Sequence, residues 1–132
     1  MLQGKSAVVT GSNSGIGLGV ARELARSGCN VALNSFTDRP EDHDLAKAIA
    51  DEFKVKAVYI KADMSVGEEC RSLVAKANDA FGGLDILVNN AGIQFVSPVE
   101  DFPVEKWNSI IAINLSSAFH TSAAAIPLFK KA

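Results

Sequence analysis

Four short apolar runs recur along the chain, and a stretch with helical periodicity separates each run from the next. The runs comprise residues 7–9, 31–33, 57–60 and 86–88. They are nearly continuous in apolar residues and do not alternate with polar ones, which is typical of strands buried on both faces of a parallel sheet. The alternation of strands and helices therefore predicts an α/β fold, a doubly wound parallel sheet with right-handed crossovers and helices on both faces.

The predicted helices have recognisable ends. Gly28 is placed to end the first helix, and Pro40 lies where the first turn of the second is expected. The third helix is predicted to begin at Ser65, because Glu68 follows three residues later as in a capping box. Residues 82–83, both glycine, should end it.

A long apolar helix is predicted from about Pro103 onward, with Pro127 expected to kink or end it. The total of 132 residues fits one domain, residues 1–132. No apolar run is expected to reach the roughly 20 residues that span a bilayer. The chain begins with a short polar segment and an apolar strand instead of a signal peptide, so a cytoplasmic protein without membrane partners is expected.

Charge and cysteine content narrow the function classes. Thirteen basic and fifteen acidic side chains give a net charge of −2, which argues against a nucleic-acid partner. The two cysteines, Cys29 and Cys70, have no partner at zinc-ligand spacing. We therefore expect no metal site and a reducing environment.

A glycine-rich segment, Thr-Gly-Ser-Asn-Ser-Gly-Ile-Gly at residues 10–17, joins the first strand to the first helix. It is not a GxGxxG motif, because Val20 stands at the third glycine, and it is not a P-loop. Glycines here allow a diphosphate to approach the backbone N–H groups of the first helical turn. The predicted cofactor contacts are Gly11, Ser12, Asn13, Ser14, Gly15, Ile16 and Gly17. The alternative is a glycine-rich turn that only joins strand to helix.

The fourth strand ends in Asn89-Asn90-Ala91-Gly92. In a doubly wound sheet, ligands lie at the carboxyl ends of the strands where the strand order reverses. Small residues there would leave room for a ribose or adenine, and the asparagines could bind main-chain groups of neighbouring strands. We therefore predict that Asn90, Ala91 and Gly92 form the wall opposite the glycine-rich segment, although an Asx-type turn would show the same residues.

With TGxxxGIG after the first strand and NNAG after the fourth, the chain resembles the short-chain dehydrogenase/reductase family over essentially its whole length. The resemblance implies a Rossmann-like doubly wound parallel sheet, truncated here after four strands and the following long helix. It implies that Asp63 contacts the adenine amino group and that Asn114 is the catalytic asparagine, in a helix distortion that orients a proton-relaying water. The cofactor contacts that it adds are Phe36, Met64 and Ile113.

Residues 33–36, 89–94 and 100–107 more narrowly resemble bacterial-type D-3-hydroxybutyrate dehydrogenases. In that group, a glutamine at the position of Gln94 contacts the substrate carboxylate. Phe95 departs from the histidine that is usual in those enzymes. The implied reaction interconverts D-3-hydroxybutyrate and acetoacetate, a step of ketone body metabolism, with a small hydroxy or oxo acid as substrate.

The family's mechanism implies hydride transfer at the nicotinamide, with a tyrosine, a lysine four residues later, and a serine. The single tyrosine, Tyr59, is followed by Asp63 at that distance, so the chain has no Tyr-x-x-x-Lys. We interpret the chain as the N-terminal half of such an enzyme and expect it to be inactive alone. We also expect an unpaired edge on the fourth strand, apolar surface on the last helix, and a homodimer or homotetramer for the full-length form.

The residues after the second strand bear on the choice of dinucleotide. Asp38 could bind ribose hydroxyls but is better explained as a solvated cap, and Arg39 could accept a 2′-phosphate. Residues 12–14 offer no basic side chain, and the resemblance is to NAD-using enzymes, so we predict NAD rather than NADP. Two alternatives stay open: an NADPH-dependent 3-oxoacyl-thioester reductase, and a non-catalytic, truncated nucleotide-binding form.

Overall fold

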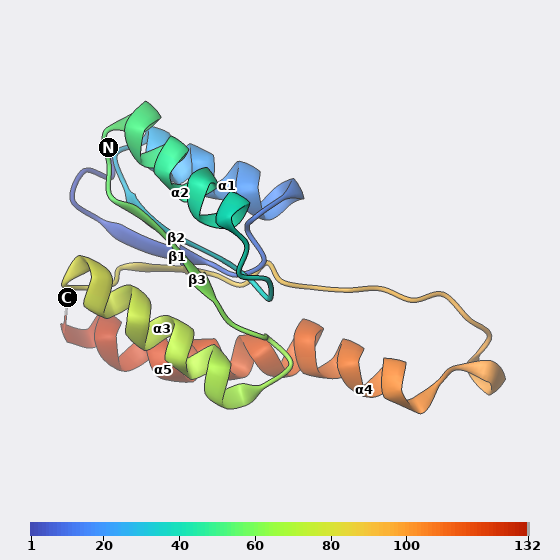
Figure 1. Ribbon diagram of the computed structural model, residues 1–132. Helices are drawn as coiled ribbons and strands as arrows, with labels where there is room; N and C mark the ends of the chain where they lie inside the picture. Colours follow the sequence, from blue (N-terminus) through green and yellow to red (C-terminus); the bar gives the residue numbers. More distant parts are fainter. Residues whose placement is uncertain (132) are drawn as a thin grey trace.

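The centre of the molecule is a four-stranded parallel sheet (Figure 1). The computed structural model describes residues 1–131, so the last residue of the predicted domain, Ala132, lies outside the described residues. The strands are β1 (Ser6–Val9), β2 (Asn30–Ser35), β3 (Ala57–Lys61) and β4 (Ile86–Val88). Their order in the sheet is β3-β2-β1-β4, with every pair parallel. The predicted α/β fold with a Rossmann-like sheet is confirmed, and the strand order reverses at β1.

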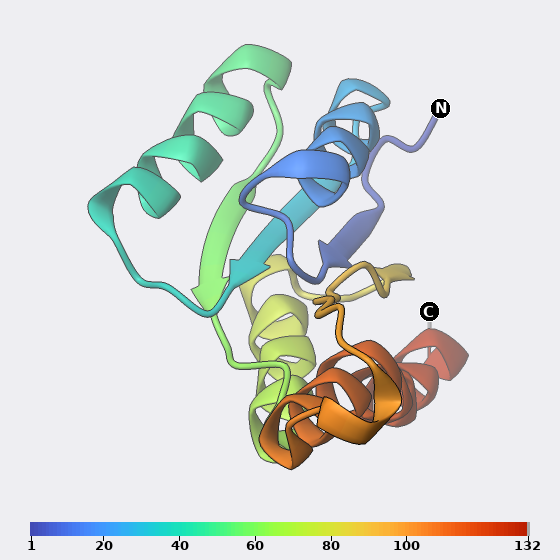
Figure 2. The same ribbon diagram turned by 90° about the vertical axis from the view of Figure 1, so that its right-hand side faces the viewer.

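Helices cover both faces of the sheet. They are α1 (Gly15–Arg26), α2 (Pro40–Phe53), α3 (Gly67–Phe81), α4 (Val104–Ile111) and α5 (Ser117–Lys131), with a short 3₁₀ turn at Val99–Asp101. In Figure 1, α1 and α2 lie above the sheet, whereas α3 and α5 lie below it. The view turned by 90° shows the same separation into three layers (Figure 2).

Each strand contains a continuous apolar run because it contributes to two cores. Val9 and Leu33 are fully buried in the cluster shared with α1 and α2. Val8 and Ala32, their neighbours in sequence, are fully buried in the cluster that includes residues of α3 and α5. Successive strand residues point to opposite faces, so a sheet covered on both sides favours continuous apolar runs instead of alternation.

Most predicted helix ends are confirmed, but the start of the third is wrong. Pro40 is the first residue of α2, and Gly82 ends α3 in a left-handed conformation at φ 71°. However, α3 begins at Gly67 and not at Ser65. The reason is local competition: the Ser65 hydroxyl donates to Asp63 Oδ1 at 2.7 Å instead of capping the helix.

The last helical region is one continuous run. A π-helical segment, Ala112–Ser116, joins α4 to α5 and contains Asn114, so the predicted distortion is confirmed. Pro127 lies inside α5 and does not end it. The whole run, Val104–Lys131, is by length and composition apolar enough to cross a membrane, which corrects the expectation that no such segment exists. A single such helix is weak evidence, because core helices pass the same test, and α5 packs on α3.

Two expected exposed surfaces are present in the described residues. β4 pairs only with β1, so its outer edge has no partner strand there. The helical run from α4 to α5 exposes large apolar side chains: Val104, Trp107, Leu115, Phe119 and Ile126. The predicted free edge and apolar helix face are therefore confirmed.

Candidate cofactor-binding site

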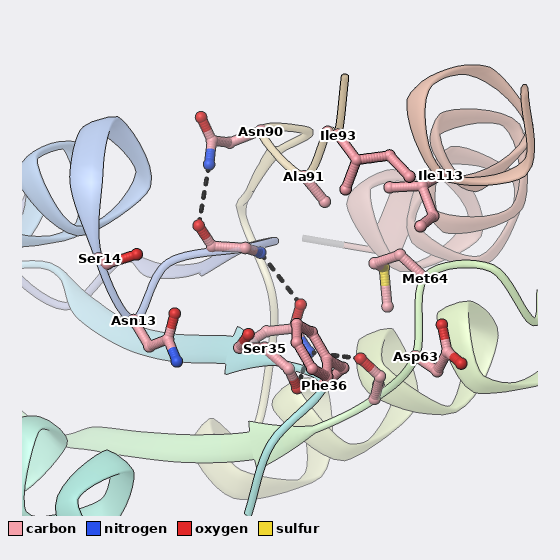
Figure 3. A pocket seen from close by; sticks show the side chains of 14 residues that line it. Asn13, Ser14, Ser35, Phe36, Asp63, Met64, Asn90, Ala91, Ile93 and Ile113 are labelled. Atoms are coloured by element: carbon pink, nitrogen blue, oxygen red, sulfur yellow. Dashed lines mark hydrogen bonds between the residues drawn. The ribbon is translucent and has the colours of Figure 1, made fainter. Parts of the chain in front are cut away.

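A cleft of about 260 Å³ opens at the carboxyl ends of the four strands (Figure 3). It lies at the reversal of strand order, where doubly wound sheets bind ligands. Ten of the predicted site residues line it: Gly11, Asn13, Ser14, Phe36, Asp63, Met64, Asn90, Ala91, Gly92 and Ile113. These residues come from the loop after β1, the ends of β2, β3 and β4, and the segment after α4.

The glycine-rich segment and the end of β4 are in direct contact. The Asn90 side chain donates to Gly11 O at 3.0 Å and to Thr10 O at 3.2 Å. In return, the Thr10 hydroxyl oxygen accepts from the backbone N–H groups of Asn90 and Ala91, both at 2.9 Å. The two motifs therefore lie together at one cleft, as predicted, but as adjoining walls and not as opposite ones. Thr10 is a connecting residue that the sequence analysis did not assign to the site.

Two glycines are required by this contact. Gly11 adopts φ +58°, and a Cβ atom there would lie 3.0 Å from Ala91 Cα. A Cβ atom on Gly17 would overlap Gly11 O and the Asn90 amide nitrogen. Both positions therefore need glycine so that the loop, α1 and the end of β4 can pack closely.

The N-terminus of α1 is arranged to receive an anion. Ser14 occupies the N-cap, but its side chain makes no capping hydrogen bond, and the first turn contains no acidic residue. The backbone N–H groups of Gly15, Ile16 and Gly17 have no partner within the helix, and the helix dipole adds positive potential there. A diphosphate group suits this position.

Four predicted contacts do not line the cleft: Ser12, Gly15, Ile16 and Gly17. Ser12 is fully buried, and its hydroxyl donates to Val9 O and accepts from Asn34 N–H. Its own N–H donates to Asn34 O at 2.6 Å. The structure thus gives Ser12 the role of holding the loop, because no polar group of this residue faces the cleft.

Asn34 is a buried residue that the sequence analysis did not assign to the site. Gly11 N–H donates to its Oδ1 at 3.1 Å, and its Nδ2 donates to Ile60 O and Ala62 O at 3.1 and 3.3 Å. One side chain therefore joins the glycine-rich loop to the end of β3. The signal in the sequence was an amide directly after the apolar run at residues 31–33. Ser35, Ala62 and Ile93 also line the cleft without having been predicted.

Asp63 lies at the exit of β3, where the family resemblance requires it. Its Oδ1 accepts from the Ser65 N–H and hydroxyl, at 2.9 and 2.7 Å, which fixes the carboxylate at the cleft wall. Phe36 lies at the cleft with 71% of its surface exposed. Met64 and Ile113 add apolar surface.

Asn114 and Gln94 lie outside the cleft lining. The Asn114 amide makes a reciprocal pair of hydrogen bonds with the backbone of Ile93, each 2.8 Å long. Asn114 thus fixes the segment after β4 to the π-helical segment, next to Ile93 and Ile113 of the cleft. Gln94 is the next residue along that segment and is exposed to solvent. The catalytic role of Asn114 and the substrate contact of Gln94 remain predictions.

Asp38, the acidic residue before α2, was expected to be a solvated cap of this helix, but it does not cap it. Asp38 pairs with His43 at 2.6 Å, and the helix is capped by Arg39 together with Asp42. Hydrogen bonds from Arg39 hold the pKa of the Asp42 carboxyl well below its ordinary value of 3.8. Neither Asp38 nor Arg39 lines the cleft.

Comparison with known proteins now decides the family. A family model described as short chain dehydrogenase matches residues 5–132. The chain belongs to the short-chain dehydrogenase family. The resemblance found from the TGxxxGIG and NNAG motifs is therefore confirmed.

Among relatives of this short-chain dehydrogenase chain, a protein named D-beta-hydroxybutyrate dehydrogenase from Cupriavidus necator is 53% identical over 99% of the chain, which covers 50% of that relative. A solved NADH-dependent reductase A1-R′, complexed with NAD, has a TM-score of 0.90 at 33% identity; the match covers 98% of this chain and 54% of that one. L-sorbose reductase from Gluconobacter frateurii, complexed with NADPH and L-sorbose, has a TM-score of 0.91 at 30% identity, with coverages of 98% and 49%. The chain thus spans about half the length of the proteins it matches.

Proposed function

We propose that the cleft binds NAD, and that the whole protein is a short-chain dehydrogenase that interconverts D-3-hydroxybutyrate and acetoacetate by hydride transfer. The observation that carries this proposal is the contact between the glycine-rich loop and the end of β4. That contact brings the small residues Ala91 and Gly92 next to the loop that leads into α1, and Ser14, the N-cap of α1, lines the same cleft. When bound, the nicotinamide would accept or supply the hydride.

The residues present fit a dinucleotide. The first turn of α1 would bind the diphosphate through backbone N–H groups. Asp63 would accept from the adenine amino group, and the absence of large side chains at Ala91 and Gly92 would leave room for a ribose. Asn90 does not need to touch the ligand, because its side chain is used to hold the loop.

Two observations favour NAD over NADP. The residues that line the cleft include no lysine or arginine, so a 2′-phosphate would have no cationic partner among them. Arg39, the nearest cation after β2 in sequence, is engaged by Asp42 at 3.0 Å. Solved relatives complexed with NAD and with NADPH support a nicotinamide dinucleotide in either case.

The substrate proposal rests on the relative from Cupriavidus necator and on Gln94. An exposed amide next to Ile93 can donate a hydrogen bond to a carboxylate bound at the open end of the cleft. We further propose, from the family resemblance, a cytoplasmic homodimer or homotetramer that acts on this small acid.

The test uses the full-length protein with NAD and D-3-hydroxybutyrate, and follows NADH formation. We expect turnover with NAD, much slower turnover with NADP, and a raised KM with smaller change in kcat for Gln94→Ala. The 132-residue chain alone should bind NADH without turnover. Absence of dinucleotide binding by the full-length protein would contradict the proposal. Turnover by the 132-residue chain would contradict only the expectation that this chain is inactive alone.

A further inference from the structure

A buried carboxylate, Asp42, is hydrogen-bonded both to the glycine-rich loop and to the turn after β2. Asp42 is in the first turn of α2, yet only 1% of its surface is exposed. Its Oδ1 accepts from Asn13 Nδ2 at 3.1 Å and from Arg39 Nη2 at 3.0 Å. Its Oδ2 accepts from the Thr37 hydroxyl at 2.8 Å and from Arg39 N–H at 3.0 Å. Arg39 Nε adds a longer contact to Oδ2 at 3.4 Å. Five donors thus satisfy both oxygens, so the carboxylate has a defined position.

These contacts join two loops that form the cleft. Asn13 lines the cleft from the glycine-rich loop, and Ser35 and Phe36 line it at the end of β2, directly before Thr37. Tyr59 on β3 donates its hydroxyl hydrogen to Thr37 O and so fixes the same turn. Asp42 is therefore coupled to the cleft on both sides without lining it.

Arg39 is the only lysine or arginine between the end of β2 and the start of α2. The residues that follow β2 are where a doubly wound sheet distinguishes a ribose 2′-hydroxyl from a 2′-phosphate, and an arginine nearby is the usual partner of that phosphate. Here, the Arg39 guanidinium is directed to Asp42, and Glu41 and Asp38 add negative charge to the same turn.

We propose that Asp42 is a specificity-determining residue that holds the Arg39 guanidinium away from the cleft, and so favours a dinucleotide without a 2′-phosphate. This inference rests on the proposed dinucleotide site. The role is indirect. Asp42 keeps the positive charge of Arg39 away from the cleft, and its hydrogen bond from Asn13 helps to position the glycine-rich loop.

The experiment measures the affinity of the full-length protein for NADH, NADPH, AMP and adenosine 2′,5′-bisphosphate by titration calorimetry. Asp42→Asn keeps the shape of the side chain but removes its charge, which releases Arg39. We expect the affinity ratio of NADPH to NADH, and of the bisphosphate to AMP, to rise roughly tenfold. The rise should shrink as salt increases.

Matched variants separate this mechanism from a general effect. Glu41→Gln removes the same charge from the neighbouring, exposed position and should change the ratio less than about twofold. Asp42→Asn combined with Arg39→Gln should lose the gain, because the released cation is then absent. A loosened loop would weaken both dinucleotides together and leave the ratio unchanged.

Arg39→Gln alone provides a second arm should Asp42→Asn fail to fold. With Arg39 already engaged by Asp42, this variant should alter NADPH affinity little. A tenfold loss of NADPH affinity in Arg39→Gln, or an unchanged ratio in folded Asp42→Asn, would overturn the inference while NADH binding still supported the proposed function. Failure of the unsubstituted protein to bind either dinucleotide would instead overturn the proposed function.

Discussion

Asn34→Ala is the perturbation that tests most directly how the cleft is held together. Asn34 is fully buried at the end of β2, and its amide is the acceptor for Gly11 N–H and a donor to Ile60 O and Ala62 O. Alanine leaves the Gly11 N–H without this acceptor and removes the donor shared by the two carbonyls. An unsatisfied buried group costs about 1–3 kcal/mol, so we expect the free energy of unfolding to fall by about 2–4 kcal/mol.

The same substitution should weaken NADH binding, because Gly11 would no longer be fixed beside Ala91. Urea unfolding followed by circular dichroism measures the stability, and calorimetry measures NADH affinity. Asn108→Ala is the control: this asparagine is exposed on α4, and the same change there should stay within about 0.5 kcal/mol. If Asn34→Ala matches Asn108→Ala in both measurements, the amide does not hold the loop and the reasoning is refuted.

Three further changes test other parts of the structure. Gly17→Ala should destabilise the protein by about 1–3 kcal/mol in the urea assay and abolish NADH binding, because the added Cβ would overlap Gly11 O. Gly19→Ala is the control on the same helix: the added Cβ meets open space, so the variant should be more stable by about 0.5–1 kcal/mol. The pKa of Asp42 is lower in the folded protein than its ordinary value of 3.8. The carboxylate therefore stabilises the protein above pH 3.8, and this stabilisation is lost as the pH falls below 3.8. Asp42→Asn should flatten the pH dependence of the free energy of unfolding below pH 3.8. Burial, and secondarily the charge of Asp85, raises the pKa of the Cys29 thiol from 9.0 to about 11. The neutral thiol therefore contributes its full stability below pH 9, and this contribution is lost as the pH rises towards 11. Cys29→Ala should reduce this alkaline loss of stability; the same dependence of unfolding free energy on pH as in the unsubstituted protein would contradict the prediction.

The fold could be predicted because its determinants are local. Continuous apolar runs marked the four strands, since each residue of these runs packs in one of two cores. From the sequence, the approach of a diphosphate explained the glycines at residues 11 and 17. The structure adds a second reason, because a Cβ atom at either position would crowd the neighbouring loop or strand end. The order of motifs along the chain then placed them together, since parallel strands end at the same edge of the sheet.

The connecting polar residues could not be predicted in the same way. Thr10, Asn34 and Asp42 each bind groups more than 20 residues away in sequence, and an isolated polar side chain does not identify such a partner. The start of α3 failed for a related reason: Ser65 can cap a helix or bind Asp63, and only the tertiary structure shows that it binds Asp63.

The same connecting residues explain why an anion site can exist before any ligand is bound. The glycine-rich loop is held by hydrogen bonds that involve the side chains of Asn90, Thr10, Ser12 and Asn34. The loop therefore does not need a ligand to keep its shape. The N–H groups of the first turn of α1 are left out of these contacts, because the Ser14 side chain does not cap them. A fixed loop with unpaired donors at one point is preorganised: binding energy is not used to order the chain. It follows that substitutions of the connecting residues should weaken dinucleotide binding, because the side chains that they remove hold the loop in place.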